Sequence, residues 1–172
     1  QTNLKIIDSS DEQTGKIIST RVTGLINERN ANLEIDAGTY KTTVNNAFAI
    51  ENNGTMKINY AKVEGTNTAL KNKGTLTIDD ITIEESAIGI STSGGTITIN
   101  NGNITTSDIG ITRDGGTVVI NNGTIYGTNY GLGGHGGYVT LNNGLIKSTD
   151  NNAIYTYDGI ITNIAQISDD SD

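Results

Sequence analysis

The side chains best suited to chemistry gather between residues 113 and 158 of this chain. They comprise an arginine, two aspartates, three tyrosines and the single histidine: Arg113, Asp114, Tyr126, His135, Tyr155, Tyr157 and Asp158. Aromatic rings beside hydrogen-bonding groups suit sugars, because a ring stacks on the sugar while donors and acceptors fix its hydroxyls. We therefore take these seven residues as a candidate ligand-binding set for a glycan. The alternative is that Tyr130 fills the core and the other tyrosines cover coil surfaces.

Paired carboxylates are the second chemistry to look for. Enzymes that cleave glycosidic bonds use two carboxyl groups held roughly 5–10 Å apart on one face. Glu64 and Glu84 fall at the same offset of a repeat, but the next two positions at that offset are Thr105 and Tyr126. This pattern predicts a solvated charged face, no catalytic residue and no enzymatic activity.

The residue types in this chain give little support for a metal-binding site. His135 is the only histidine and the chain has no cysteine, so an ordinary transition-metal site lacks its ligands. The stretch GLGGHGG around His135 is similar to a calcium-binding nonapeptide repeat, but it occurs once and lacks the aspartate of that repeat. We expect no metal and no cofactor.

Composition and net charge limit the classes of partner that the chain could bind. The 172 residues suffice for one domain, with 22 glycines, no proline, no cysteine, no tryptophan and a formal net charge of −8. No run of lysine or arginine occurs, so nucleic acid and anionic membranes are poor partners. No apolar stretch is long enough to cross a membrane, so we expect no membrane insertion.

A repeat of about 21 residues organises the whole chain. Residues 74–94, 95–115 and 116–136 each begin with Gly-Thr and have equal length, while residues 54–73 lack one residue and residues 137–158 gain one. We expect these insertions and deletions in turns. The sequence thus predicts a single domain over 1–172, with irregular first coils in 1–53, regular repeats in 54–158, and a last strand with an acidic tail in 159–172.

Apolar residues alternate with polar ones at a period of two within each repeat, which predicts three short strands per unit. LKII, GKIIS and TGLI would form the three strands of a first coil in residues 1–31. Stacked units place like side chains above one another in interior columns. We expect these columns to be Leu33, Met56, Leu76, Ile97, Val118, Val139; Ile35, Ile58, Ile78, Ile99, Ile120, Leu141; Tyr40, Val63, Ile83, Ile104, Ile125, Ile146; and Ile50, Leu70, Ile90, Ile111, Leu132, Ile154, the last flanked by Ile88, Ile109 and Tyr130.

Asn-Asn-Gly recurs after the first strand of three successive units. Asparagine and glycine tolerate the positive φ that a sharp bend requires, and stacked asparagines can hydrogen-bond along a column. Asn100, Asn121 and Asn142 are therefore predicted to form a structural turn ladder rather than a ligand site, with Asp79-Asp80 in place of the asparagine pair one unit earlier.

These patterns predict an all-β fold, a right-handed single-stranded parallel β-helix (β-solenoid) of about seven coils of roughly 21 residues. The hand follows from the strong preference of parallel crossovers for right-handed connection.

The repeat strings resemble the right-handed parallel β-helix repeat regions of bacterial cell-surface and adhesin-like proteins. The resemblance rests on G-T-(L/I/V)-x-I-(N/D)-(N/D)-G-x-I at 74–83, 95–104 and 116–125, and on the opening LKIIDSS to TGKIIS at 4–19. It implies a scaffold and an extracellular, bacterial cell-surface location. It does not define an activity, because polysaccharide-degrading enzymes, tailspikes and adhesins share this architecture.

Our preferred prediction of function is an extracellular structural and adhesive module whose partners are host or microbial glycans or surface proteins. A polysaccharide lyase or hydrolase is the runner-up. A subunit that associates end to end into a filament is a third possibility, because solenoid ends expose unpaired strands. Ice binding is a remote fourth, suggested by the outward pairs Thr75/Thr77 and Thr96/Thr98 and weakened by Val119 and Tyr138 in the same columns.

Overall fold

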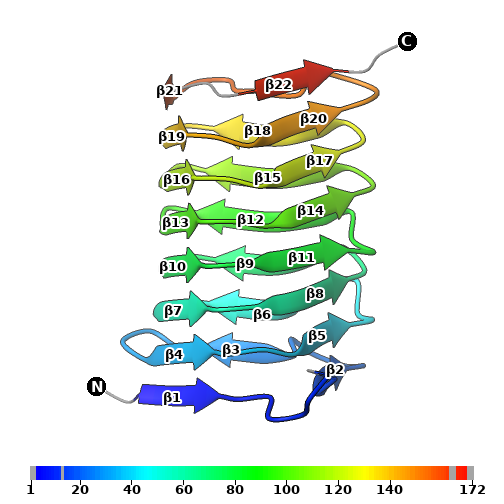
Figure 1. Cartoon of the computed structure of the whole chain (residues 1–172). Coiled ribbons are helices and arrows are strands. Elements are labelled where there is room, and N and C mark those ends of the chain that lie inside the picture. Colours follow the sequence, from blue (N-terminus) through cyan, green and yellow to red (C-terminus); the bar gives the residue numbers. More distant parts are fainter. Residues whose placement is uncertain (1–2, 13, 163–165, 170–172) are drawn as a thin grey trace.

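The chain folds into a stack of coils built only from β-strands and turns (Figure 1). The structure is a computed structural model that describes residues 3–12, 14–162 and 166–169. Within those residues there is no helix, and all strand pairs are parallel. Most coils contribute one strand to each of three sheets, which we call sheets A, B and C.

Sheet A has eight strands in the order β1 (Asn3–Ile6), β4 (Asn32–Ile35), β7 (Thr55–Ile58), β10 (Thr75–Ile78), β13 (Thr96–Ile99), β16 (Thr117–Ile120), β19 (Tyr138–Leu141) and β21 (Ile160–Thr162). Sheet B has eight strands in the order β2 (Lys16–Ser19), β5 (Thr39–Thr42), β8 (Ala61–Gly65), β11 (Ile81–Glu84), β14 (Asn103–Thr106), β17 (Thr124–Gly127), β20 (Leu145–Ser148) and β22 (Gln166–Asp169). Sheet C has six strands, β3 (Leu25–Asn27), β6 (Phe48–Asn52), β9 (Thr68–Asn72), β12 (Ile88–Ser93), β15 (Ile109–Asp114) and β18 (Tyr130–His135).

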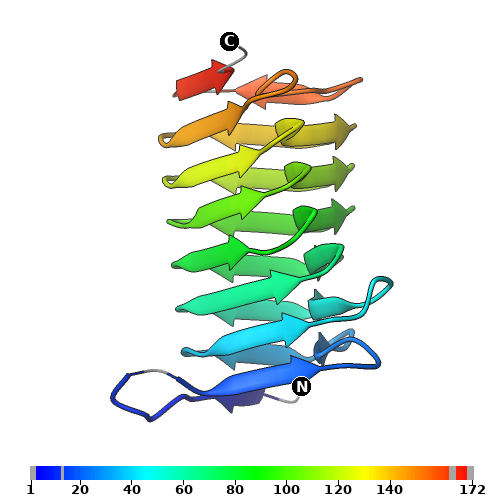
Figure 2. The ribbon, with the colours of Figure 1, turned by 90° about the vertical axis from the view of Figure 1, so that its right-hand side faces the viewer.

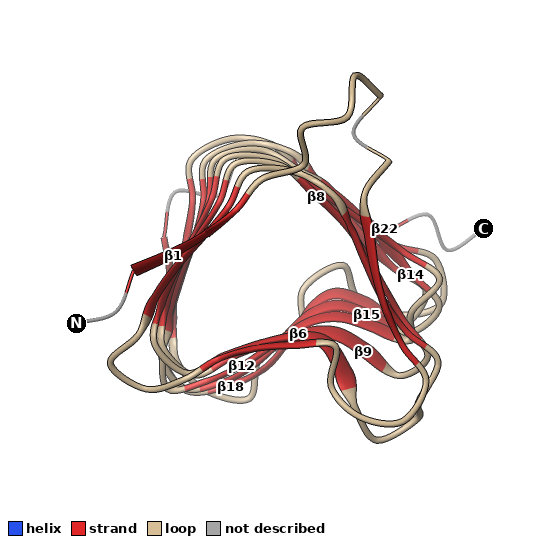
Figure 3. Cartoon of the chain, turned by 90° about the horizontal axis from the view of Figure 1, so that it is seen from below, coloured by secondary structure: helices blue, strands red, loops and turns tan. Residues whose placement is uncertain are grey.

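The three sheets form the sides of a triangular tube, seen along its axis in Figure 3. The amino-terminal end faces the viewer there, and the chain runs clockwise from β1 past sheet B to sheet C as it recedes. That path is a right-handed coil. The structure thus confirms the predicted right-handed parallel β-solenoid and its repeat of about 21 residues, in which Thr75 pairs with Thr96 and Thr96 with Thr117.

The predicted interior columns are confirmed by strand register. Leu76 pairs with Met56 on one side and with Ile97 on the other, and all three side chains are buried. A buried aliphatic side chain of this size contributes roughly 1.5–3 kcal/mol relative to an exposed one, and no single coil could bury such a stripe alone. The core is therefore a continuous apolar column along the axis, whose members in the first coils include the fully buried Tyr40.

The length changes between repeats lie where the chain turns, as expected. Asn72 and Thr75 are separated by two residues, whereas their partners Thr92 and Thr96 in the next coil are separated by three. The missing residue of unit 54–73 therefore belongs to the turn from sheet C to sheet A. The extra residue of unit 137–158 lies between β20 and the bridge at Ile154.

The predicted first coil is present. LKII, GKIIS and TGLI correspond to β1, β2 and β3, but a long loop separates β1 from β2 and projects from the base of the stack (Figure 2). The Asp8 carboxylate organises this loop by accepting hydrogen bonds from the backbone N–H groups of Ser10 and Gly15.

The last coil is less regular than the three-strand pattern predicts. Sheet C ends at β18 and continues only as an isolated bridge from Leu132 to Ile154, because the inserted residue interrupts the third strand of that unit. The final IITNIAQI supplies β21 and β22, as expected for the start of another coil. Of the acidic tail, Asp169 ends β22, whereas Asp170 and Asp172 lie outside the described residues.

Candidate functional site

The seven residues of the candidate ligand-binding set do not share one surface. Arg113 points into the solenoid and is only 2% exposed, so its guanidinium is not available to an external ligand. Its Nη2 donates to the Thr156 hydroxyl and, at 3.4 Å, to the Asp158 carbonyl, while Nε and Nη1 have no hydrogen-bond partner. Burial lowers the pKa of this arginine, and the nearby Asp158 opposes that shift.

Asp114 and His135 are exposed neighbours on adjacent coils. They are register partners at the ends of β15 and β18, and the His135 Nδ1 lies 3.4 Å from the Asp114 Oδ1. They can therefore form an ion pair when the imidazole is protonated.

Asp158 holds a turn. Its carboxylate accepts a hydrogen bond from the Gly136 N–H, and its carbonyl accepts one from the Thr156 hydroxyl at 2.6 Å. These contacts fasten the chain after the Ile154 bridge to the coil beneath it, which gives Asp158 a structural role.

The tyrosines of the set divide between two sides of the solenoid. Tyr155 packs against the partly buried Tyr130, with ring centroids 5.1 Å apart, and Tyr157 beyond it is 81% exposed. Tyr126 lies elsewhere, on sheet B between Thr105 and Lys147, with its hydroxyl 3.2 Å from that of Thr149. The structure thus brings Asp114, His135, Tyr155 and Tyr157 to the sheet C side, and leaves Tyr126 and Arg113 apart from them.

The carboxylates of sheet B are neutralised by lysines. Glu64 lies 2.6 Å from the Lys41 Nζ and 3.1 Å from the Lys62 Nζ, and Lys62 also pairs with Glu84. Contrary to the expectation of a solvated face, Glu64 is only 7% exposed. The cluster is a partly covered ion network across β5, β8 and β11.

The electrostatics of this network do not suit a proton donor. Burial would raise the pKa of Glu64, but hydrogen bonds from Lys41 and Lys62 outweigh it and hold that pKa below its ordinary value. A general acid needs the opposite shift, toward neutrality.

Two asparagine ladders run along the turn between sheets A and B. In the predicted one, Asn142 donates to Asn121, Asn121 to Asn100, and Asn100 to Asp79, at 2.7, 2.8 and 2.9 Å respectively. A second, parallel ladder takes the following residue of each turn: Asn143, Asn122, Asn101 and Asp80, with side-chain bonds of 3.2–3.4 Å. In both ladders each asparagine amide donates to the preceding coil. The two ladders therefore end at the carboxylates of Asp79 and Asp80, which only accept.

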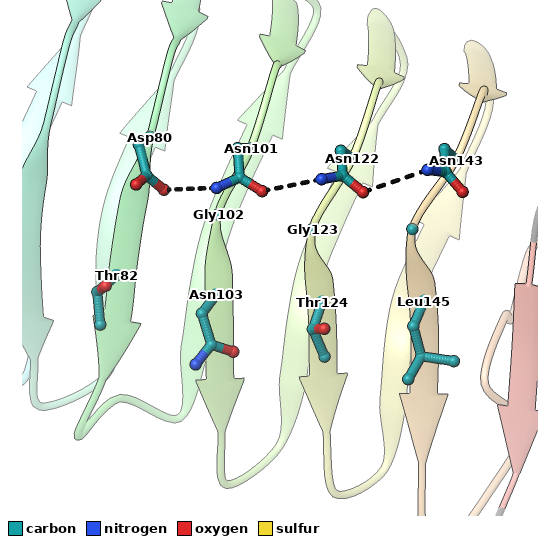
Figure 4. Close-up of a pocket in the computed structure, with 11 residues that line it drawn as sticks. Asp80, Thr82, Asn101, Gly102, Asn103, Asn122, Gly123, Thr124, Asn143 and Leu145 are labelled. Carbon is teal, nitrogen blue, oxygen red and sulfur yellow. Dashed lines mark hydrogen bonds between the residues drawn. The ribbon is translucent and has the colours of Figure 1, made fainter.

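The second ladder, which we call the surface ladder, forms one wall of an open groove (Figure 4). The opposite wall consists of the first outward-facing side chain of each of four successive sheet B strands. The backbone of the turn glycines forms the floor. The lining residues are Asp80, Thr82, Asn101, Gly102, Asn103, Asn122, Gly123, Thr124, Asn143, Gly144 and Leu145, around a volume of about 560 Å³. The groove runs parallel to the solenoid axis.

Glycine is required on this floor. Gly123 has φ +117°, and a Cβ there would lie 2.3 Å from the carbonyl oxygen of Gly102. Any side chain would push the coils apart, so the floor stays open and the two walls stand above it. The sequence pattern Asn-Asn-Gly predicted the turn, but not the groove that three such turns form together.

A third asparagine column is internal, and the sequence patterns did not identify it. Asn27, Asn52 and Asn72 end β3, β6 and β9, and are buried. Asn27 donates to Asn52 and Asn52 to Asn72, both at 2.8 Å. The recurring signals Ile50-Glu51-Asn52 and Leu70-Lys71-Asn72 could have pointed to it. We call this set the buried ladder.

The threonine pairs considered for ice binding do stand in register on the outer face of sheet A. Thr75 and Thr77 pair with Thr96 and Thr98, but the next coil places Val119 at the second position. Tyr138 then takes the first position and is 59% exposed. The array is therefore two coils deep before it is interrupted.

Within the described residues, no three carboxylate, histidine or cysteine side chains converge to hold a metal ion, and no helix has the length and apolarity to cross a membrane. Comparisons with known proteins add no relative: no family model, no curated protein and no solved structure matches the chain. The solenoid architecture and its repeat are what the findings establish.

Proposed function

We propose that this chain is a rod-forming adhesive module of an exported bacterial surface protein, and that it binds glycans. The observation that carries the proposal is that each coil pairs residue for residue with the next one. Each outward-facing position therefore recurs along the solenoid axis at the strand spacing of about 4.8 Å. Such register turns single residues into rows of identical groups, such as Thr75, Thr96 and Thr117. A row of identical polar groups complements a repetitive polymer better than a single small molecule.

The rod-like role is supported by the packing. Beyond its own strands, each coil buries its apolar residues only against the coils next to it, so the total stability of the stack increases with the number of registered coils. The resemblance of the repeat strings to adhesin-like surface proteins supports the extracellular location. The net charge of −8 and the absence of a basic run argue against nucleic acid as the polymer.

A binding function is favoured over polysaccharide cleavage because of the state of the carboxylates. Glu64 and Glu84 are held in pairs with lysines, and the Asp158 carboxylate is engaged by a backbone N–H. Asp114 faces His135 on the adjacent coil. Glu64 and Glu84 both contact the Lys62 Nζ, so their carboxylates lie close together. The lysines hold the pKa of Glu64 below its ordinary value, whereas glycoside hydrolysis needs one carboxyl group that donates a proton.

A glycan array probed with the purified chain tests this proposal. We expect binding to one or more repetitive glycans, with no release of reducing ends on prolonged incubation. An array without any bound glycan would overturn the adhesive function, and cleavage of the bound polymer would favour the enzyme. Labelling of intact cells of the source bacterium with an antibody against the chain tests the location.

End-to-end association is a second candidate, favoured by one specific observation. The first coil exposes apolar side chains that the coils above it bury: Leu4 is 57% exposed, whereas its register partner Leu33 is 5% exposed. A strand edge with exposed apolar groups can pair with another strand. Light scattering should then give masses above the monomer that Leu4→Lys reduces, and a monomeric wild-type chain would rule the association out.

A further inference from the structure

We infer that the groove over the surface ladder binds a neutral linear polysaccharide lengthwise, along the solenoid axis. The inference rests on the glycan-binding function proposed above and names its site and ligand class. It moves the site from the tyrosine-rich side of sheet C to the turn between sheets A and B. Three properties of the groove carry it: its hydrogen-bonding capacity, its spacing and its charge.

The surface ladder has hydrogen-bonding capacity beyond its own bonds. A side-chain amide has two N–H donors and an oxygen with two lone pairs, and the ladder engages one donor and one lone pair of Asn122. Asn101, Asn122 and Asn143 are exposed, and their side chains lie in one row along the groove in Figure 4. The row therefore presents a donor and an acceptor per coil, all in the same orientation, which suits the hydroxyl groups of a sugar chain.

The spacing of this row selects among polymers. Neighbouring coils are about 4.8 Å apart, whereas an extended peptide repeats its side-chain direction every two residues, or about 6.7 Å. A peptide would therefore fall out of step within two coils. An extended chain of β-1,4-linked pyranose rings advances by approximately one ring per coil. Successive rings are turned over, but both edges of each ring carry hydrogen-bonding groups, so each ring can bond to the Asn of its own coil. The four coils that line the groove would hold three to four rings.

The charge of the groove selects a neutral ligand. Among the lining residues the one ionisable side chain is Asp80, at one end, and the rest are Asn, Thr, Gly and Leu145. An anionic polymer would meet no lysine or arginine there and would be repelled by the net charge of −8. Neutral hydroxyl-bearing rings need only the hydrogen bonds that the walls provide, with Leu145 giving one apolar contact.

Titration of the isotope-labelled chain with neutral tetrasaccharides, followed by NMR of the asparagine side-chain amides, tests this inference. The probes are cellotetraose, mannotetraose and tetra-N-acetylchitotetraose, with polygalacturonate as the anionic control. Because the groove lacks an aromatic ring, we expect weak binding, with a dissociation constant of about 0.1–1 mM. The amide signals of Asn101 and Asn122 should shift with at least one neutral probe and not with polygalacturonate.

Two adjacent asparagines provide matched variants. Asn122→Ala removes a groove amide, whereas Asn121→Ala removes the equivalent amide of the neighbouring ladder, which does not line the groove. We expect Asn122→Ala to weaken binding of the tetrasaccharide about fivefold, and Asn121→Ala to leave it within twofold. Thr124→Ala, on the opposite wall, should weaken it also and gives a second variant if Asn122→Ala perturbs the fold.

The outcomes separate this inference from the proposed function. If the wild-type chain binds array glycans but Asn122→Ala and Thr124→Ala bind as well as Asn121→Ala, the groove is not the site and the adhesive function stands. Preference for polygalacturonate would overturn the neutral ligand class. If the wild-type chain binds no glycan on the array or in the titration, the function and the inference fall together.

Discussion

Of the three asparagine columns that run along this solenoid, the buried ladder and the surface ladder differ in what their amides can still bind. In the buried ladder, Asn52 donates to Asn72 and to the carbonyl of Thr75, and accepts from Asn27 and from the N–H of Gly54. In the surface ladder, Asn122 makes only the two bonds along its own row. The same residue type and the same stacking therefore yield amides with all their hydrogen bonds made inside, and amides with spare donors and acceptors outside.

The buried ladder also joins two sheets. Asn27 and Asn52 lie at the end of sheet C strands and donate to the carbonyls of Thr55 and Thr75, which begin sheet A strands. These bonds therefore close the corner between the sheets through amides that are themselves buried, and an unsatisfied buried amide has a high desolvation cost. We expect the stability of the first coils to depend on it.

The largest expected effect is that of Asn52→Ala. The substitution leaves the buried amides of Asn27 and Asn72 without their Asn52 partner, and removes the part-buried bonds to the Thr75 carbonyl and from the Gly54 N–H. It should lower the free energy of unfolding by about 3 kcal/mol or more. Urea denaturation followed by circular dichroism measures it. If Asn52→Ala lowered the free energy of unfolding no more than Asn122→Ala does, the contrast between the two ladders would be contradicted.

The next effect concerns the coils where the buried ladder stops. Thr92 and Arg113 continue the register of Asn72, and Arg113 carries two nitrogens without a partner. Replacing a buried charge by an apolar side chain of similar volume is often stabilising, so Arg113→Met should raise the free energy of unfolding by about 1 kcal/mol. Arg113→Ala, which also leaves a cavity, is the control and should lower it. A stability loss in Arg113→Met as large as in Arg113→Ala would show that the charge itself holds the last coil.

A smaller effect is expected on the surface. Asn122→Ala breaks two exposed side-chain bonds that water can replace, so the free energy of unfolding should change by about 0.5 kcal/mol or less. Thermal unfolding of Asn121→Ala and Asn122→Ala should therefore be nearly equal, although only the latter is expected to weaken tetrasaccharide binding. A large loss in either variant would mean that the surface ladders are structural in the same sense as the buried one.

The smallest effect is a pH dependence at the acceptor end of the predicted turn ladder. The Lys57 ammonium and the Asn100 amide hold the pKa of Asp79 below its ordinary value. A carboxyl group with a lowered pKa in the folded state stabilises the fold above its unfolded pKa, and that contribution is lost as the pH falls through the folded value. The melting temperature of Asp79→Asn should thus fall less than that of the wild type on acidification from pH 5 to pH 3. Equal falls would indicate that Asp79 contributes nothing as an ionised acceptor.

The candidate site was predicted less well than the fold, for a physical reason visible in particular residues. The alternation around Leu76 and Ile78 determines which side chains face inward, and packing then follows from register. Arg113 occupies an inward position of the same alternation, on a strand where Ile111 is inward too, yet its type suggested the surface. Tyr126 and Tyr155 belong to neighbouring units but lie on different sides of the solenoid, Tyr126 on sheet B and Tyr155 beside Tyr130 of sheet C, so proximity in sequence did not bring them together.

The amino-acid sequence by itself determined the period, the strands, the inward aliphatic columns and the asparagine turns, because each of these depends on local spacing that the backbone repeats in every coil. Only the tertiary structure decided what the rows of equivalent residues become. Stacking closed one row of asparagines against the corner of two sheets and left another at the wall of an open groove. The two rows differ in their position around the coil. That position depends on the angles between the sheets, which the residue spacing within a single unit does not determine.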